Sequence, residues 1–232
     1  MEKIAVEYLS IEITRRCNMK CAHCLCGDAQ NIDIDLEHIR SLIRRVSSIE
    51  SLCFTGGEPS LNVPAIKFTL EQIKRRRIKV NRFNIVTNGS LSSINKEFIA
   101  VCQKLCDYQA ACGEEDDICE EILYLSNDRY HDDTHHYEVN KELSKLSFYS
   151  RRFSENVPYR LIRQGRCKEG IDLPDTVFCY RKSEITGTVF LNANGYILGN
   201  CNYSYENQEK HQLCHVDGFM EYLRKNEIKT LY

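Results

Sequence analysis

Residues 7–24 read EYLSIEITRRCNMKCAHC, and the architecture follows from this segment. Its first part, Glu7–Thr14, alternates apolar and polar residues, as a strand with one buried face does. The strand leads directly into Cys17, Cys21 and Cys24, which are spaced C-x₃-C-x₂-C. Thiolates are soft ligands, and cysteine is the usual protein ligand of iron–sulfur clusters. The segment therefore predicts a metal or cluster loop at the end of the first strand.

Strands and helices alternate along the rest of the chain. The other expected strands are Ser51–Thr55, Arg82–Thr87, Ile122–Ser126 (preferred to Tyr108–Cys112), Val157–Ile162, and Thr186–Leu191 followed by Tyr196–Leu198 in a hairpin. The expected helices are Leu36–Ile49, Ala65–Arg77, Asn95–Cys106 and Asn140–Ser150. Strands separated by helices of this length form parallel βαβ units, and five or six units are too few for a closed eight-stranded barrel. We therefore expect an α/β fold, an open, partial (β/α)₆ TIM-type barrel with a short cysteine-containing C-terminal extension.

Candidate functional residues follow the ends of the expected strands. Cys17, Gly56, Asn88 and Asp128 each come directly after one of them. In barrels of this type the loops at the carboxyl ends of the strands carry the chemistry. The four positions are therefore expected to meet at one end of the sheet.

Composition excludes several classes of protein. The formal net charge of −2 predicts no general nucleic-acid binding, and no stretch is long and apolar enough to predict a signal peptide or a membrane span. We therefore expect a cytoplasmic protein without a membrane partner. The chain has 13 cysteines, an odd number that a reducing compartment would not pair into disulfides. Metal or cluster binding is the better explanation for some of them.

Three cysteines in one short loop can bind three corners of a [4Fe–4S] cubane and leave the fourth iron open to another ligand. A structural zinc ion would instead need four protein ligands, and Cys26 or His23 could complete that set. A non-catalytic zinc-binding module is therefore the alternative to a cluster enzyme.

The cysteine loop resembles the C-x₃-C-x-Φ-C signature of the radical S-adenosylmethionine (SAM) superfamily, with His23 at the Φ position. The resemblance implies that SAM binds the open iron. An electron from the cluster then cleaves SAM to methionine and a 5′-deoxyadenosyl radical. It also implies that His23 contacts the adenine, and that an external one-electron reductant of the flavodoxin or ferredoxin type supplies the electron.

Gly56-Gly57-Glu58 matches the GGE motif that receives the SAM amino group in this superfamily. Glycines allow a close backbone approach, and a carboxylate or carbonyl accepts a hydrogen bond from an ammonium group. The alternative interpretation is an ordinary strand-to-helix turn with Glu58 near a helix start.

The turns after later strands supply further candidates for SAM binding. Asn88 lies in a Thr-Asn-Gly turn that many members of the superfamily share. Ser126 and Asp128 occupy the place where the family binds the SAM ribose, although a helix cap would use the same residue types. Arg163, or Arg160, could pair with the SAM carboxylate.

His131 belongs to the run DRYHDDTHH over residues 128–136. We consider His131 a candidate catalytic acid–base group near the end of the fourth strand. The alternative for the run is a solvated loop.

The C-terminal third contains Cys167, Cys179, Cys201 and Cys214. Peptide-modifying members of the superfamily carry auxiliary clusters in SPASM or twitch extensions at this place, so these four are candidates for a second iron–sulfur cluster. Their spacing lacks the C-x₂-C pair of that pattern, and buried free thiols are common. We divide the chain into a radical SAM core over residues 1–165 and a second part over 166–232. That second part contains the last barrel strand and a twitch-like extension.

The resemblance sets the initiating chemistry and leaves the substrate open. The compact size and the cysteine-rich C-terminal third favour hydrogen-atom abstraction from a ribosomally made peptide. Two other enzymatic functions remain as alternatives. One is a small-molecule or nucleoside enzyme similar to 7-carboxy-7-deazaguanine synthase, and the other is an activase of a glycyl-radical enzyme.

Overall fold

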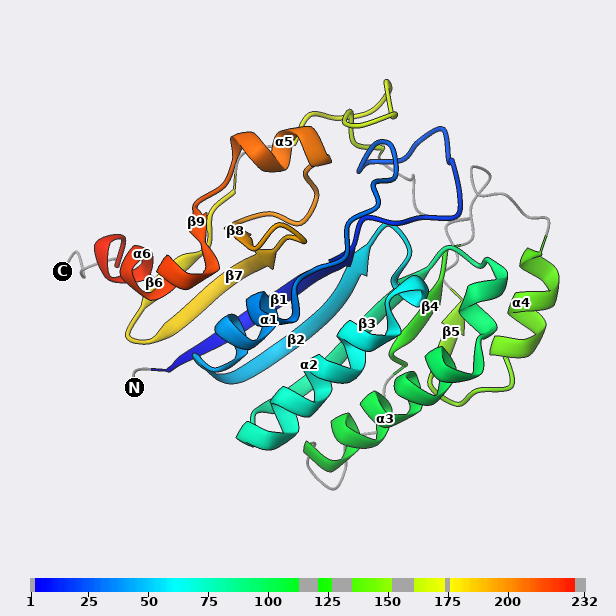
Figure 1. The fold of residues 1–232 in the computed structure, drawn as a ribbon, viewed down its shortest axis with the longest axis horizontal. Helices are drawn as coiled ribbons and strands as arrows, with labels where there is room; N and C mark the ends of the chain where they lie inside the picture. The colour runs from blue at the N-terminus through cyan, green and yellow to red at the C-terminus, as the bar shows by residue number, and fades with distance from the viewer. Residues whose placement is uncertain (1–2, 113–120, 127–134, 152–160, 174–175, 228–232) are drawn as a thin grey trace.

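The computed structural model describes residues 3–112, 121–126, 135–151, 161–173 and 176–227. One sheet runs through these residues in the order β5-β4-β3-β2-β1-β7-β8-β9, and β6 pairs with β7 (Figure 1). The strands are β1 (Ile4–Thr14), β2 (Val46–Gly56), β3 (Lys79–Thr87), β4 (Leu123–Leu125), β5 (Tyr149–Arg151), β6 (Cys179–Arg181), β7 (Glu184–Leu191), β8 (Tyr196–Leu198) and β9 (Cys214–His215).

The parallel part of the sheet does not close on itself. β1 to β5 pair in sequence order, and β7 pairs in parallel with the other edge of β1. The strands β6, β8 and β9 join in antiparallel pairs on the far side of β7. This arrangement confirms the predicted open, partial barrel. The first strand therefore lies inside the sheet, between β2 and β7.

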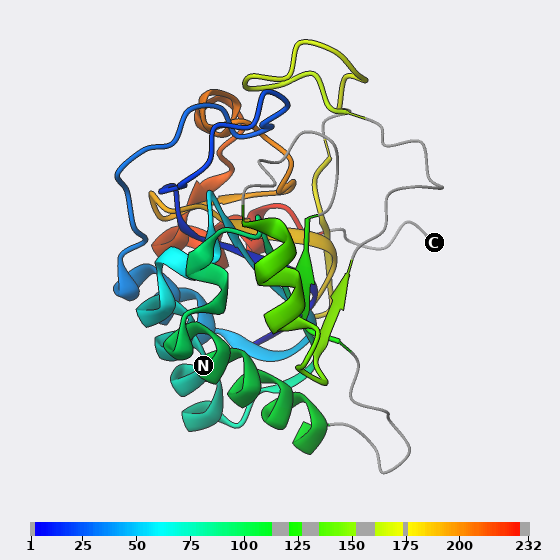
Figure 2. The ribbon, with the colours of Figure 1, turned by 90° about the vertical axis from the view of Figure 1, so that its right-hand side faces the viewer.

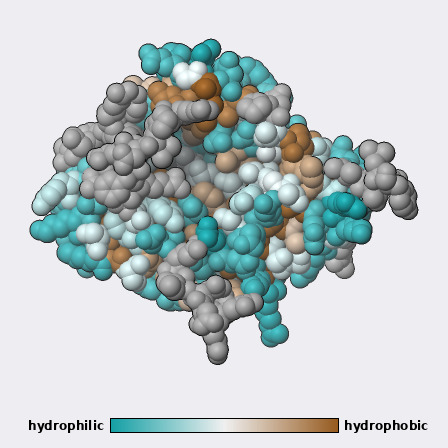
Figure 3. All heavy atoms as spheres, turned by 180° about the vertical axis from the view of Figure 1, so that it is seen from behind, coloured by the Kyte–Doolittle hydropathy of each residue, from teal (hydrophilic) through white to brown (hydrophobic). Residues whose placement is uncertain are grey.

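Helices cover one face of the parallel strands, which is turned toward the viewer in Figure 1 and lies on the left in Figure 2. They are α1 (Leu36–Ile43), α2 (Val63–Arg76), α3 (Lys96–Cys112) and α4 (His136–Leu143). Alternate strand residues such as Ile11, Phe54 and Ile85 point toward them and are fully buried. From behind, the molecule is hollowed near its centre (Figure 3).

The C-terminal part adds short elements around β7. These are α5 (Tyr205–Lys210), α6 (Phe219–Lys225) and the 3₁₀ turn η3 (Val216–Gly218); two further 3₁₀ turns, η1 (Pro59–Leu61) and η2 (Leu91–Ile94), follow β2 and β3. The sheet is continuous across residue 165, so the division at this point stays a prediction. None of the described helices is long and apolar enough to cross a membrane.

Three expected elements differ from the structure. The helix from Leu36 ends at Ile43, because the residues from Val46 onward pair with β1 and extend β2. Val46 and Ile49 have a spacing that fits either a helix or an irregular strand, so the pattern alone could not separate them. The expected helix Asn140–Ser150 lies earlier, at His136–Leu143.

The fifth parallel strand is Tyr149–Arg151, within the segment expected to be helical, and Val157–Ile162 was the wrong choice for it. Residues 157–160 lie outside the described part of the chain. Ile162, the last residue of the expected strand, forms an isolated bridge with Ile171.

Candidate active site

The cysteine loop leaves the carboxyl end of β1 and returns beside it. Thr14 and Asp33 form an antiparallel bridge, and the amide N–H of Arg15 donates to the Ile32 carbonyl over 2.8 Å. The Gln30 amide donates back to the Arg15 carbonyl at 3.0 Å. The two ends of the loop are therefore held together at its base, and the cysteines lie in the closed segment between them.

Cys17, Cys21 and Cys24 line one pocket with a volume of about 290 Å³. The pocket walls include four of the other residues singled out in the sequence, His23, Gly57, Asn88 and Ser126. These residues come from the cysteine loop and from the turns after β2, β3 and β4. The structure thus brings together, at the carboxyl ends of four parallel strands, the motifs that the sequence places there.

The thiols of the loop differ in their surroundings. Burial raises the pKa of Cys17, and it raises the pKa of Cys21 to about 11. A hydrogen bond from Cys26 lowers the pKa of Cys24 to about 5, and this same bond, together with burial, raises the pKa of Cys26. This hydrogen bond therefore favours the ionised form of Cys24 over that of Cys26.

Three thiols that line one pocket are a donor set that suits a [4Fe–4S] cluster. Among the described residues, no three His, Cys, Asp or Glu side chains converge on a point that could hold a single metal ion. A mononuclear zinc site needs such convergence, whereas each cysteine of a [4Fe–4S] cluster binds a different iron. Cys26 is not among the residues that line the pocket. Three cysteine thiols are thus presented to the pocket.

The glycines of the GGE segment allow β2 to approach the base of the cysteine loop. Gly57 donates its amide to the Thr14 carbonyl and Glu58 donates to the Arg16 carbonyl, both at 2.9 Å. A Cβ atom added to Gly57 would lie 2.3 Å from the Arg16 oxygen, and one on Gly56 would lie 2.2 Å from the Thr14 oxygen. Because no Cβ fits at these distances, glycine is required at both positions.

The Glu58 side chain lies behind the pocket. It is fully buried and does not line the pocket. Its carboxylate accepts hydrogen bonds from the Asn88 amide at 2.8 Å, the Thr87 hydroxyl at 2.8 Å, and the Ser60 hydroxyl at 2.6 Å and amide at 3.1 Å. Burial raises the pKa of Glu58, which these donors partly offset. In this arrangement Glu58 holds the turn after β3.

Asn88 connects this turn to the cysteine loop. Its side-chain amide donates to the Asn18 side-chain oxygen at 3.0 Å and to the Cys17 sulfur at 3.7 Å. Ser126 is fixed from the other side, since its carbonyl oxygen is 2.7 Å from Nε2 of His136. Both residues therefore line the pocket from turns that are held by hydrogen bonds to a buried side chain, Glu58 for Asn88 and His136 for Ser126.

Among the described residues, Arg163 is a predicted site residue that is not brought to the pocket. Arg163 donates to the Gly170 carbonyl at 3.0 Å and pairs with Asp172 at 3.7 Å, and it does not line the pocket. Asp128, Arg160 and His131 lie outside the described residues, so their roles remain predictions.

The four C-terminal cysteines have different surroundings. Cys167 is buried and its thiol donates to the Glu169 carbonyl at 3.1 Å, whereas Cys179 is exposed on β6. Cys201 packs beside Phe190 in a small apolar cluster, and Cys214 packs against the main core. A second cluster at these cysteines remains a prediction.

Four pocket residues were not expected from the sequence, the apolar Leu25, Leu161 and Ile162 and the polar Asn202. Asn202 lines the pocket from the segment that precedes α5. Its backbone amide donates to the Asn200 side chain at 2.9 Å in a tight turn. An isolated asparagine distant in sequence from the motifs gives no signal that it lies beside them.

Residues 11–109 match the family model of the Radical SAM superfamily. This segment contains the cysteine loop, the GGE segment and the turn after β3, which meet at the pocket. Residues 11–109 therefore resemble the radical SAM superfamily, whose members are enzymes that use a [4Fe–4S] cluster and SAM.

Curated relatives match a little more than a third of the chain. A GTP 3′,8-cyclase from Clostridium acetobutylicum is 38% identical over 92 residues, covering 37% of this chain and 28% of the cyclase. An uncharacterised protein from Methanocaldococcus jannaschii is 28% identical over 90 residues, covering 37% of this chain and 32% of that protein. These matches span less than a third of the relatives' own length.

Solved structures share the fold over nearly the whole chain. BtrN in complex with AdoMet and 2-DOIA has a TM-score of 0.51 at 16% identity, over 98% of this chain and 89% of BtrN. A structure of anSMEcpe with AdoMet and the Kp18Cys peptide has a TM-score of 0.54 at 13% identity, over 96% of this chain and 81% of anSMEcpe. At these identities the likeness shows the partial-barrel fold.

Proposed function

We propose that Cys17, Cys21 and Cys24 hold a [4Fe–4S] cluster with one open iron, that SAM binds beside it, and that the enzyme abstracts a hydrogen atom from a ribosomal peptide. The observation that carries this proposal is the single pocket that the three thiols share with Gly57 and Asn88. When bound, the cluster supplies the electron that cleaves SAM reductively. That electron comes from an external flavodoxin- or ferredoxin-type reductant.

The chain's own residues orient SAM in this proposal. The backbone of Gly57, which no side chain covers, accepts from the SAM amino group, and His23 lies against the adenine. Ser126 binds the ribose from the turn after β4. Glu58 acts from behind, by fixing the turn that carries Asn88. Leu161 and Ile162 contribute apolar side chains to the pocket wall.

Three expected roles complete the site. Asp128 assists Ser126 at the ribose, Arg163 pairs with the SAM carboxylate after a change of partner, and His131 is the acid–base group. Arg163 would have to leave Gly170 and Asp172 for this role. These assignments are tested by substituting each residue and measuring the KM for SAM separately from kcat.

The peptide substrate is supported by the likeness to the peptide-bound anSMEcpe structure. A second candidate is a small-molecule or nucleoside substrate. It is favoured by the match to GTP 3′,8-cyclase over 92 residues, and by the fold shared with BtrN bound to 2-DOIA.

Anaerobic reconstitution tests the cluster. We expect about four irons per chain, a brown colour and 5′-deoxyadenosine formation from SAM and dithionite. Alanine at Cys17, Cys21 or Cys24 should abolish that formation. The matched control is Cys53→Ala, on β2 and outside the residues that line the pocket. One zinc per chain without colour, or full activity in any of the three variants, contradicts the proposal.

Deuterium transfer separates the two substrate classes. Candidate peptides and nucleotides are supplied in deuterated form, and 5′-deoxyadenosine is analysed by mass spectrometry. Deuterium that enters the product from a peptide supports the first class, and deuterium from a nucleotide supports the second.

A further inference from the structure

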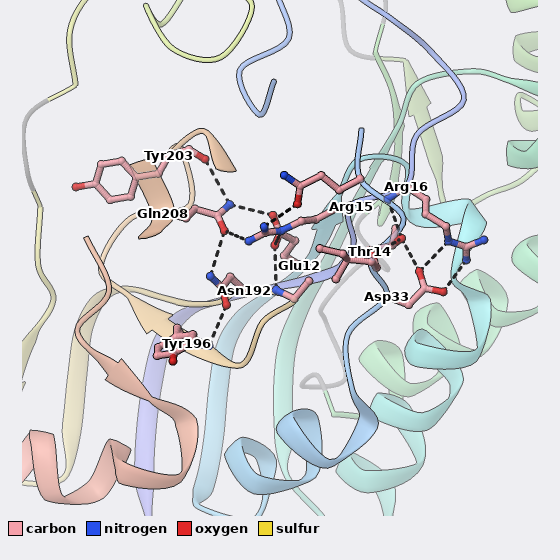
Figure 4. Close-up of polar contacts among 12 residues, drawn as sticks. Glu12, Thr14, Arg15, Arg16, Asp33, Asn192, Tyr196, Tyr203 and Gln208 are labelled. Atoms are coloured by element: carbon pink, nitrogen blue, oxygen red, sulfur yellow. Dashed lines mark hydrogen bonds and ion pairs between the residues drawn. The ribbon is translucent and has the colours of Figure 1, made fainter. Parts of the chain in front are cut away.

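A buried ion pair lies directly beneath the cysteine loop (Figure 4). Arg15, two residues before Cys17, and Glu12, at the end of β1, are each 1% exposed. The Arg15 Nε donates to the Glu12 carboxylate at 2.9 Å. A buried charge destabilises the folded protein unless hydrogen bonds and opposite charges satisfy it. The partners of this pair therefore restrict the position of the cysteine loop.

Gln208, on α5, completes the pair from the far end of the chain (Figure 4). Its amide nitrogen donates to Glu12 at 2.9 Å, and its amide oxygen accepts from Arg15 at 2.7 Å. Gln208 is 1% exposed, so these bonds form without competition from water. One side chain therefore bonds both members of the ion pair.

The remaining bonds of the pair also join separate segments. Arg15 donates to the side chain of Gln30, at the returning end of the cysteine loop, at 2.9 Å. Glu12 accepts from the Ala193 amide at 2.9 Å, in the turn between β7 and β8. The Arg15 guanidinium lies 4.6 Å from the centre of the Tyr205 ring. No part of the network can shift alone without leaving a buried charge short of a partner.

The backbone of the cysteine loop rests on the same C-terminal residues. The Tyr205 amide donates to the Cys26 carbonyl at 3.0 Å, and the Arg166 amide donates to the Cys24 carbonyl at 2.9 Å. Asn202, just before α5, lines the pocket beside the thiols. Docking of the C-terminal segment and the geometry of the loop are therefore linked by side chains and by backbone.

We propose that Gln208 is a positioning residue for the cysteine loop. Through Glu12 and Arg15 it locks residues 15–30 against α5, so that the C-terminal segment is part of the cluster site. The link to the cluster rests on the function proposed above, whereas the locking of the loop does not depend on it. The sequence gives no sign of this role, since Gln208 and Glu12 are 196 residues apart.

A charge swap tests the lock. Gln208→Glu places a second carboxylate against Glu12, with one guanidinium between them. The double variant Glu12→Gln with Gln208→Glu restores one carboxylate, one amide and the donor–acceptor matches among Glu12, Arg15 and Gln208. It loses only the longer bond of 3.4 Å that the Gln208 amide donates to the Tyr203 carbonyl. Gln103→Glu, on the exposed face of α3, is the control for adding a carboxylate.

Hydrogen–deuterium exchange of the iron-free protein gives the first readout. In Gln208→Glu the amides of residues 15–30 should exchange about tenfold faster, because a hydrogen bond to a buried charge is lost, while those of α2 keep their rate. The double variant and Gln103→Glu should behave as the wild type. An unchanged loop, an equal rise in α2, or a double variant no better than the single one overturns the proposal.

Gln30→Ala keeps the test decisive if Gln208→Glu does not fold. Gln30 is partly exposed, and this variant removes the hydrogen bond that Arg15 donates to it. The backbone amides of the cysteine loop alone should then exchange severalfold faster. No change in the loop overturns the proposal.

Iron release from the reconstituted protein to a chelator gives the second readout. It should be about tenfold faster in Gln208→Glu and restored by the swap. Equal rates in both variants and the wild type overturn the link to the cluster. A protein that binds no cluster leaves the exchange result standing, so this failure is distinct from failure of the proposed function.

Discussion

The side-chain amide of Asn88 donates to the sulfur of Cys17 over 3.7 Å, and the Asn88 backbone amide is itself bound to Glu58 over 2.8 Å. The donor is therefore supported by a fully buried carboxylate. Hydrogen bonds to ligand sulfurs stabilise the reduced, more negative state of an iron–sulfur cluster and raise its reduction potential.

Replacing Asn88 by alanine should lower the cluster potential by on the order of tens of millivolts, because the donor to Cys17 is lost. A redox titration followed by electron paramagnetic resonance measures the change. The control is Asn81→Ala, since Asn81 lies on β3 and bonds to exposed Glu50. A potential equal to that of the control would show that the bond does not tune the cluster.

Cys26→Ala should retain about four irons per chain, because Cys26 donates to Cys24 and does not line the pocket. Cys21→Ala, the matched loss of a pocket thiol, should lose the cluster. Iron and sulfide analysis after anaerobic reconstitution distinguishes the two variants. Loss of iron in Cys26→Ala equal to that in Cys21→Ala would make Cys26 a ligand.

Gly57→Ala should destabilise the protein by about 1–3 kcal/mol, because the new Cβ would lie 2.3 Å from the Arg16 oxygen and force backbone to move. Urea unfolding of the iron-free protein measures this loss. Gly218→Ala is the control, since a Cβ there meets nothing within 4 Å. Equal stability of both variants would contradict the close approach of β2 to the loop.

Glu58 should give the stability of the protein a specific pH dependence. Burial raises its pKa in the folded state, so the folded protein binds this proton more tightly than the unfolded chain. The free energy of unfolding therefore falls as pH rises from the ordinary glutamate range, at about 4.3, through the raised value. Glu58→Gln should remove this slope.

Urea unfolding at several pH values, compared between the wild type and Glu58→Gln, tests the sign of the slope of the free energy of unfolding against pH. The exposed Glu71 supplies the control variant Glu71→Gln, which should keep the wild-type slope. A slope that is the same in all three proteins, or that rises with pH only in the wild type, would contradict a raised pKa at Glu58.

The sequence was sufficient for the parts of the fold and site that depend on local pattern. β1, the cysteine loop, and the turns at Gly57 and Asn88 follow from periodicity and from residue chemistry within 100 positions of one another. Long-range relations could not be inferred, because Glu12 gives no indication that it bonds Gln208. β5 was misplaced because a three-residue strand, Tyr149–Arg151, is too short to show a period.

Glu58 shows a different limit. The motif identifies the residue, but the sequence does not specify which way its side chain turns. That direction is set by Ser60, Thr87 and Asn88, whose donors surround the carboxylate behind the pocket. The type of residue was predicted, and the contacts were not.

The placement of β1 between β2 and β7 has a consequence for biosynthesis. A ribosome makes β1 and the cysteine loop before β7, Ala193 and Gln208, which come nearly two hundred residues later. Until then one edge of β1 has no neighbour, and the Glu12–Arg15 pair lacks partners that it has in the finished protein. The cysteine loop therefore reaches its final geometry for metal delivery only after synthesis has passed Gln208.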